Sequence, residues 1–473
     1  MQSGGSADDP YHATDGADGD PAPADRSDED CASPERFHGD HARADGEHAR
    51  AEPSDDPVAS RRSFLKAAVA VGGAVGLAAC LGERGRPDLP RGPASLSMLP
   101  ERQHAWNAVL ATDEAGNVVP PRHRVLLTLS LPGEGPPTED QRTTVESALR
   151  TLEHAYPRTH RGLLFTVGYS PYYFDRFEAS LPPSVDLPAP GALAPFEDPA
   201  PDDADVMVHL ASDVPAAVIT AGQALRGTID SLNGVPVTHA LTEVLSVEDR
   251  RTGFVGSGLP ADHEAVTDVA DGTIPTAAPL YMGFKSSFAE NQASEAQVTI
   301  DEGPFSPGTT QHVSRIDLDL ERWYEQDDRY QRVAKMFCPH HAEADAVEGV
   351  GANLGTSSGM TSCGRPTEAA RESGVVGHSQ KMVSAREDGD PIILRRDFDT
   401  TDGDRPGLHF LALQAGIEDF ETTRRAMNGT EVAEESAVGT RTNNGILQYM
   451  AVRRRGNFLL PPRSLRALPP ADP

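Results

Sequence analysis

One stretch of the sequence constrains the fold more than any other, because its strand-like and helix-like segments follow one another in a characteristic order. Residues 124–131 (RVLLTLSL) are typical of a strand. A helix begins near Thr138, with Gln141 completing a capping-box pattern. Asp205–Leu210 alternates apolar and polar residues, as a half-buried strand does. The other expected elements are a strand over Leu163–Val167, a helix entered through Pro215 and a strand over Thr238–Val247. This order predicts a ferredoxin-like α+β unit with an antiparallel sheet.

The later part of the chain contains a second group of regular elements. Val313–Leu320 alternates apolar and charged residues and predicts a strand. Gly407–Gln414 predicts another strand, and Ile417–Met427 predicts a helix that ends at Asn428-Gly429.

The charge of the chain excludes one class of partner. The 473 residues include 72 acidic and 42 basic side chains, for a net charge of −30. Such a chain has no basic stripe to displace the counterions of a nucleic acid, so we expect no nucleic-acid partner. The only lysines are Lys66, Lys285, Lys335 and Lys381. An acidic surface poor in lysine favours solubility in concentrated salt and suggests a halophilic source.

The N-terminal region has the composition of an export signal rather than of a folded domain. Residues 1–57 have almost no large apolar side chains, so we expect them to be disordered. Residues 58–80 combine an arginine pair, an apolar run and a lipobox-like end at Cys80, which resembles a twin-arginine lipoprotein signal. Cys80 is then either the lipidated residue that anchors the protein to the membrane or an incidental thiol. Residues 81–100 predict a tether, and the mature protein is expected on the outer face of the cell membrane or outside the cell.

Two further cysteines, Cys338 and Cys363, allow several interpretations. Cys338-Pro339-His340-His341 with Cys363 is a candidate zinc set, although the spacing matches no familiar closed site. A disulfide between Cys338 and Cys363 suits an exported protein better. Free thiols are the next alternative, and a metal site is the third.

Several runs of the sequence resemble the dye-decolourising (DyP-type) haem peroxidases. These runs are LLFTVGYSPYYFDRF (163–177), DADVMVHLASDVPAAVITAGQALR (203–226) and GHSQKMVSAREDGDPIILRRD (377–397). The resemblance extends from about Arg102 to the C-terminus. It implies an α+β fold of the dimeric α+β barrel type, with a first ferredoxin-like half over 101–250. A second half over 251–473 is expected to hold the cofactor, haem b (heme b).

The same resemblance implies a set of site residues. His378 corresponds to the proximal ligand of the haem iron. Arg396 corresponds to the distal arginine and is preferred to Arg395, because it directly precedes Asp397 at the spacing that the family shows. The two arginines alternate along a strand, so only one of them can face the pocket. Gly283 and Phe284 correspond to a motif at the haem.

One position departs from the family pattern. The family carries a distal aspartate where this chain has Ser286. A carboxylate can take a proton from hydrogen peroxide and return it to the leaving oxygen, whereas an unaided serine cannot at neutral pH. Glu290 is close in sequence and is a candidate substitute for the missing base.

These inferences define three alternatives. The first is a haem peroxidase that reduces hydrogen peroxide with an organic reductant, with a homo-oligomer as one option. The second is a non-catalytic haem-binding or haem-handling lipoprotein, and the third is a surface module that has lost haem.

Overall fold

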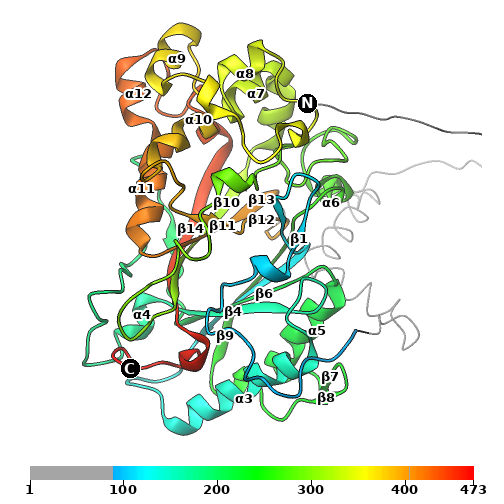
Figure 1. Ribbon diagram of the computed structural model, residues 1–473, viewed down its shortest axis with the longest axis vertical. Helices are drawn as coiled ribbons and strands as arrows, with labels where there is room; N and C mark the ends of the chain where they lie inside the picture. Colours follow the sequence, from blue (N-terminus) through cyan, green and yellow to red (C-terminus); the bar gives the residue numbers. More distant parts are fainter. Residues whose placement is uncertain (1–88, 404) are drawn as a thin grey trace, which may run out of the picture. The chain divides into compact units, whose positions relative to one another are not determined.

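The structure is a computed structural model and describes residues 89–403 and 405–473 (Figure 1). The elements of its first half are β3 (His123–Ser130), α3 (Glu139–Ala155), β4 (Leu164–Tyr169), β6 (Val206–Ser212), α5 (Pro215–Leu225) and β9 (Ser246–Phe254). Its strands pair antiparallel in the order β9-β3-β6-β4. This is the order of a ferredoxin-like unit, which confirms the predicted fold class.

For the first half, the structure confirms the predicted capping box and contradicts one predicted strand. The capping box at α3 is present, since the Gln141 amide donates to Thr138 Oγ1 at 3.3 Å and Gln141 Oε1 accepts from the Thr138 amide at 2.8 Å. The strand predicted over Thr238–Val247 is wrong, because β9 begins only at Ser246. Leu241 and Leu245 pack against the core of the first half from a loop, which explains the apolar residues there. β9, the last strand of this sheet, ends at Phe254.

The second half repeats the same arrangement. Its elements are β10 (Thr309–Leu318), β12 (Phe398–Thr400), β13 (Gly407–Gln414), α11 (Ile417–Asn428) and β14 (Met450–Leu460), with the short β11 (Leu394–Arg395) also on β13. The strand order is β14-β10-β13-β12, again antiparallel. In Figure 1 helices α3 and α5 lie over the first half, and several shorter helices gather around the second. These helices are α7 (Arg329–Met336), α8 (Pro339–Glu343), α9 (Pro366–Ser373), α10 (His378–Met382) and α12 (Thr430–Glu435).

The remaining described elements are small. They are β1 (Ala111–Thr112), β2 (Val118–Val119), α4 (Pro171–Phe174), β5 (Ala200–Pro201), β7 (Ser231–Leu232), β8 (Val235–Pro236) and α6 (Leu259–Asp262).

The two sheets join at both edges and close into a barrel. Asp399 of β12 pairs with Phe254 of β9, and Leu459 of β14 pairs with Tyr169 of β4. The barrel interior contains an apolar cluster that draws on strands of both halves through Leu126, Met207, Val313, Leu394, Phe398, Leu411, Leu413, Phe458 and Leu460. Alternate residues of each strand point outward, so each half also has an outer sheet face that its helices cover.

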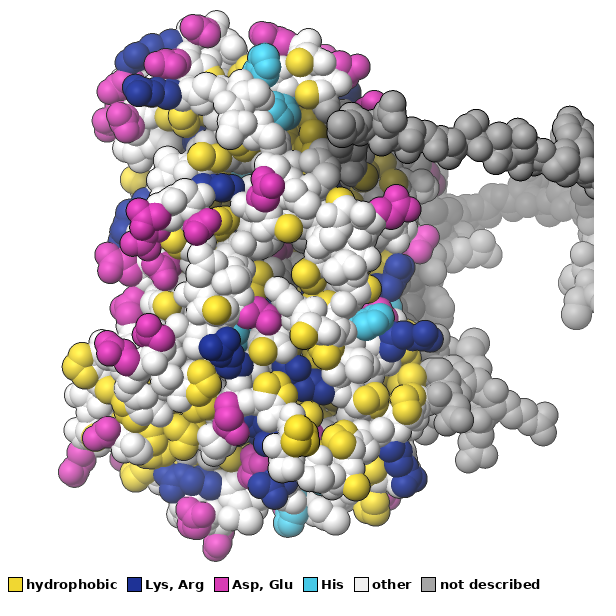
Figure 2. Space-filling model, viewed as in Figure 1, with side chains coloured by type: hydrophobic (Ala, Val, Ile, Leu, Met, Phe, Trp, Pro, Cys, Tyr) yellow, Lys and Arg dark blue, Asp and Glu magenta, His cyan; other side chains and the backbone are white. Residues whose placement is uncertain are grey.

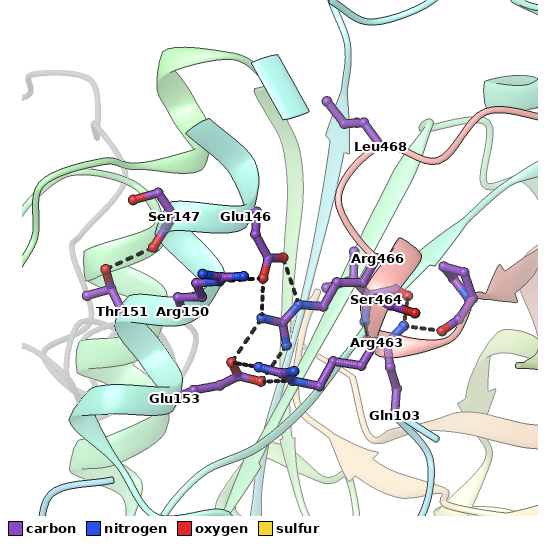
Figure 3. Close-up of polar contacts among 12 residues, drawn as sticks. Gln103, Glu146, Ser147, Arg150, Thr151, Glu153, Arg463, Ser464, Arg466 and Leu468 are labelled. Carbon is purple, nitrogen blue, oxygen red and sulfur yellow. Dashed lines mark hydrogen bonds and ion pairs between the residues drawn. The ribbon is translucent and has the colours of Figure 1, made fainter. Parts of the chain in front are cut away.

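The C-terminal segment fastens the second half to the first (Figure 3). Arg466, which is buried, donates to Glu153 Oε1 at 2.5 Å and to Glu146 Oε2 at 3.1 Å, both on α3. Arg463 adds a bond to Glu153 Oε2 at 2.6 Å. Burial alone raises the pKa of Glu153, but the hydrogen bonds from the two arginines outweigh burial and hold this pKa below its usual value.

The predictions for residues 1–57 and 58–80, including Cys80, and for most of the tether, lie outside the described residues. From Leu89 onward the chain is in contact with the first half, where Arg91 donates to the carbonyl oxygens of Asn233 and Gly234. Among the described residues, none of the helices has both the length and the apolar character that a membrane span requires. Acidic side chains gather along the edge that carries α11 and α12 (Figure 2).

Candidate active site

A cavity of about 220 Å³ lies between the outer sheet face of the second half and the helices that cover it. Its sheet side is lined by Ser314, Ile316, Leu318, Leu408, Phe410, Met450 and Val452. Its helix side is lined by His378, Ser379, Met382, Phe420, Thr423, Arg424 and Met427. The equivalent layer of the first half is filled by Val125, Leu127, Leu129, Val145, Leu149 and Leu152. An apolar cavity with a few polar groups is typical of a ligand site.

His378 begins α10 and lines the cavity, as the sequence predicts for a ligand-binding histidine. Burial, with a smaller contribution from Lys381, lowers its pKa to about 3, so the ring is neutral at physiological pH. Its Nδ1 is enclosed and has no hydrogen-bond partner among the described residues. The preceding Gly377 is required by close packing, because a Cβ there would lie 1.7 Å from the Phe337 carbonyl oxygen. His378 therefore presents a neutral imidazole at the cavity wall.

The Arg395–Asp399 segment presents three ionisable side chains to the cavity. Arg395, Asp397 and Asp399 all line it, as alternate residues of an extended chain do. Arg395 donates through Nη2 to the Ser286 carbonyl oxygen at 2.7 Å. Only one of the paired arginines lines the cavity, and it is Arg395 rather than Arg396, the residue chosen from the sequence.

Arg396 points to the other side of the same segment, together with Leu394 and Phe398 of the barrel interior. Its Nη2 donates to the His104 carbonyl oxygen at 2.6 Å and to Glu295 Oε1 at 2.9 Å. Its guanidinium carbon lies 4.3 Å from the centre of the Trp106 ring. Arg396 is therefore a structural residue of the barrel wall.

The two aspartates in the cavity were not singled out from the sequence. Asp399 is fully buried, and burial, followed by the negative charge of Asp397, raises its pKa well above the usual value. Its Oδ2 accepts from the Tyr281 amide at 2.7 Å, while Oδ1 has no hydrogen-bond partner in the described part of the chain. Burial therefore favours the protonated form of Asp399 over the charged form. The period of two in RRDFD would have revealed both aspartates once Arg395 was placed.

The loop after β9 supplies only part of what was expected. Phe284 and Ser286 line the cavity, whereas Gly283 does not. Gly283 has a φ of +82°, and a Cβ there would lie 2.7 Å from Tyr324 Oη, so its role is to allow the turn. Glu290 is exposed, bonds to Thr356 Oγ1 at 3.1 Å and lies away from the cavity. Glu290, the substitute base predicted from the sequence, is thus not among the residues that line this cavity.

Cationic side chains are concentrated around this cavity in an otherwise acidic protein. They are Lys285, Arg386, Arg395, Arg424 and Arg455. Glu197, from the first half, holds two of them in place, accepting from Arg424 at 2.5 Å and from Arg455 at 2.8 Å. This arrangement favours a ligand that is mostly apolar and carries negative groups.

Solved structures with a similar fold are DyP-type peroxidases. A putative dyp-type peroxidase from Shewanella oneidensis has a TM-score of 0.51 at 12% identity, covering 73% of this chain and 94% of that chain. A dye-decolorizing protein from V. cholerae has a TM-score of 0.48 at 15% identity and covers 76% and 98% of the two chains. A variant of Rhodococcus jostii RHA1 DypB in complex with heme has a TM-score of 0.47 at 16% identity and covers 77% and 98%. At these identities the likeness shows the fold alone, an α+β fold that this chain shares with the Shewanella oneidensis protein.

None of the curated proteins compared with the chain matches it. The sequence of residues 121–462, which includes both ferredoxin-like halves, matches the family described as "Family of unknown function (DUF7405)". The chain therefore belongs to the DUF7405 family.

Proposed function

We propose that this protein binds haem b and reduces hydrogen peroxide with electrons from an organic reductant. The observation that carries this proposal is the neutral imidazole of His378 on an apolar cavity that also contains Arg395 and two aspartates. The fold is shared with DyP-type peroxidases, one of which is described in complex with heme.

The residues present fit a haem group by their chemistry. His378 would bind the iron through its ring nitrogen, since a neutral imidazole is a common haem ligand. The apolar side chains of β10, β13 and α11 suit the macrocycle, and the arginines around the cavity suit its two carboxylates. Among the described residues the enclosed Nδ1 of His378 has none of the acceptors that usually orient such a ligand. Haem, when bound, supplies the redox metal that reacts with peroxide and receives electrons.

The chain's own residues would handle charge and protons. Arg395 places a fixed positive charge in the cavity, where it stabilises negative charge developing on an oxygen. Asp397 is the carboxylate available to take a proton from peroxide, in place of the aspartate that Ser286 replaces. Asp399 holds a proton that its Oδ1 can deliver to a leaving oxygen. Two neighbouring carboxyl groups in different environments are a common arrangement for acid and base roles.

Reconstitution of the purified full chain with haemin tests the cofactor. We expect an intense Soret absorption band with one haem per chain, and its loss in His378→Ala. His263→Ala is the matched control, because His263 lies outside the cavity and should leave the band unchanged. A wild-type protein without a Soret band would remove both haem-based functions and leave the purely structural module.

A non-catalytic haem-binding function is the second candidate, and the serine at position 286 favours it. Peroxide-dependent oxidation of a dye by the reconstituted protein separates the two. The peroxidase proposal requires multiple turnovers that Asp397→Asn reduces strongly, whereas a haem carrier gives no turnover above free haemin.

We also propose that the protein is exported by the twin-arginine route and anchored by a lipid at Cys80, facing concentrated salt outside the cell. The motifs Ser60–Lys66 and Leu77–Cys80 support this proposal. Replacing Cys80 by Ser should move the protein from the membrane fraction to the medium, and unchanged fractionation would refute the anchor. Size-exclusion chromatography at high salt tests the homo-oligomer.

A further inference from the structure

A second group of potential metal ligands lies next to α10, the helix that begins with His378. Cys338, His341 and Cys363 are all buried, and their ligand atoms lie within 4.8 Å of one another. Cys338 and Cys363 form a disulfide, which was the favoured interpretation of the sequence. His341 Nδ1 is 3.1 Å from Cys338 Sγ and 3.3 Å from Cys363 Sγ.

The orientation of the His341 ring is set by its other nitrogen. Nε2 lies 2.9 Å from the Ser358 carbonyl oxygen, and a carbonyl can only accept a hydrogen bond, so Nε2 carries the proton. Nδ1 therefore points a bare lone pair at two sulfur atoms, neither of which has a hydrogen to donate in the disulfide. Burial lowers the pKa of His341, which keeps the ring neutral. A backbone acceptor that fixes the tautomer in this way is typical of a metal-binding histidine.

A fourth soft ligand is close to this group. Met360 Sδ lies 3.9 Å from Cys363 Sγ, one turn before it in the chain. Thiolate and thioether sulfur select copper(I), whereas zinc takes thiolate, imidazole and carboxylate ligands. His340, the exposed neighbour of His341, points elsewhere and is not part of the group.

We propose that Cys338, His341, Cys363 and Met360 form a copper(I) site when the disulfide is reduced. Reduction by a thiol transfers two electrons and two protons to the cysteine sulfurs and leaves the reductant as its own disulfide. Binding of Cu⁺ then releases both protons, giving two thiolates, one neutral imidazole and one thioether around the ion. Metal bonds of about 2.0–2.3 Å put neighbouring ligand atoms roughly 3.5–3.8 Å apart. The present contacts of Nδ1 are close to this, and the two sulfurs need to separate.

The proposed copper site shares no residue with the lining of the cavity proposed for haem, but both sites contact α10. Gln380 Nε2 donates to the Cys363 carbonyl oxygen at 2.7 Å, and the Gln380 backbone amide donates to the Phe337 carbonyl oxygen at 3.3 Å. The copper ligands and His378 are thus attached to the same short helix.

The test is a copper(I) titration of the haem-free full chain under anaerobic conditions. All samples carry Cys31→Ser and Cys80→Ser, so that only the two buried cysteines remain. The protein is reduced with a phosphine, the phosphine is removed, and the sample competes for Cu(I) with a chromophoric chelator. We expect one Cu(I) per reduced chain and none for the disulfide form.

Variants assign the ligands. Cys363→Ser and His341→Gln should lose the tight site, while His340→Gln should keep it, with circular dichroism showing that each variant is folded. Loss of an outer-shell partner alone costs about 10–100-fold in metal affinity, so Met360→Leu should weaken Cu(I) binding at least about tenfold. The same variant should leave Zn(II) affinity unchanged.

Three results overturn the proposal. The first is that the reduced protein takes up no more Cu(I) than Cys363→Ser. The second is that Met360→Leu binds Cu(I) as tightly as the parent protein. The third is that an equimolar amount of Zn(II) displaces the Cu(I). The third result would identify a zinc site instead. None of these outcomes depends on haem, so failure here leaves the proposed peroxidase function in place.

Discussion

The paired arginines at 395 and 396 offer the sharpest test of the site, because adjacent residues of one type should give opposite phenotypes. Arg395→Gln removes a cation from the cavity wall but only one hydrogen bond within the protein, to the Ser286 carbonyl oxygen. We expect it to cost about 1 kcal/mol of stability. Removing a group that stabilises charge in a transition state costs about 10²–10³-fold in kcat, or about 2.7–4 kcal/mol. The variant should therefore fold, bind haem and turn over peroxide poorly.

Arg396→Gln should do the reverse. It breaks the ion pair with Glu295 and leaves that carboxylate without its cation, next to the Trp106 ring that Arg396 covers. Breaking a buried ion pair by removing one partner costs about 3–5 kcal/mol. With an unfolding entropy of roughly 2.1 cal/mol/K per residue, a chain of this length should lose roughly 3–5 °C of Tm.

The assays are thermal unfolding and steady-state dye oxidation on haem-reconstituted wild type and both variants, below the Tm of the weakest. The expected result is a low kcat with a normal Tm for Arg395→Gln, and a low Tm with a nearly normal kcat for Arg396→Gln. The opposite pattern would refute the assignment of faces, since it would put Arg396 at the reacting atoms. Equal effects of both substitutions on kcat would show that the charge of the whole segment matters, rather than the side chain in the cavity.

Three further substitutions test other parts of the structure. Glu153→Gln leaves the buried Arg466 with less negative charge beside it and should lower the free energy of unfolding by about 3–5 kcal/mol at neutral pH. The difference in stability from wild type should shrink as pH falls through the lowered pKa of Glu153. Denaturant unfolding at several pH values measures this difference. The pH dependence at Asp399 runs in the opposite direction, because a raised pKa means that wild-type stability falls as pH rises above the ordinary value of 3.8. Asp399→Asn should therefore gain stability relative to wild type as pH rises. A constant difference in stability across pH would contradict this. Gly377→Ala forces a Cβ to within 1.7 Å of the Phe337 carbonyl oxygen and should displace α10, so that the Soret band weakens or shifts while the far-ultraviolet circular dichroism is retained.

Much of the fold could be predicted because its information is local. The strand at Asp205–Leu210 and the capped helix at Thr138 show the period and the end signals of their elements within a few residues. β9 escaped prediction because Ser246–Asp249 is exposed and polar, so its pairing with β3 leaves no apolar alternation in that part of the sequence. Leu241 and Leu245, the apolar residues just before β9, pack against the core of the first half without forming a strand. The sequence pattern alone cannot distinguish such residues from a strand.

The site was predicted less completely because its register depends on distant residues. Alternation shows that Arg395 and Arg396 face opposite sides, but it does not say which side holds the cavity. The choice is made by Glu295 and Trp106, which lie far from position 396 in sequence and bind Arg396 inside the barrel. His378 was identified because the segment that carries it resembles a family, whereas the neighbouring Cys338–His341–Cys363 group is assembled by a chain reversal that spacing alone does not reveal.

The difference between the helices of the two halves explains why the large cavity between sheet and helices lies in the second half. The inward stripe of α3 is apolar throughout, with Val145, Leu149 and Leu152 packed on the sheet. The corresponding stripe of α11, at the spacing i, i+3, i+4 and i+7, is Phe420, Thr423, Arg424 and Met427. An arginine and a threonine cannot pack dry against an apolar sheet without partners, and Arg424 is instead held by Glu197 at the edge of the cavity. In the first half the helix α3 therefore packs directly on its sheet, whereas in the second half a cavity lies between the sheet and α11. A ligand with an apolar body and negative groups would satisfy both the sheet and the arginines, as the proposed haem would.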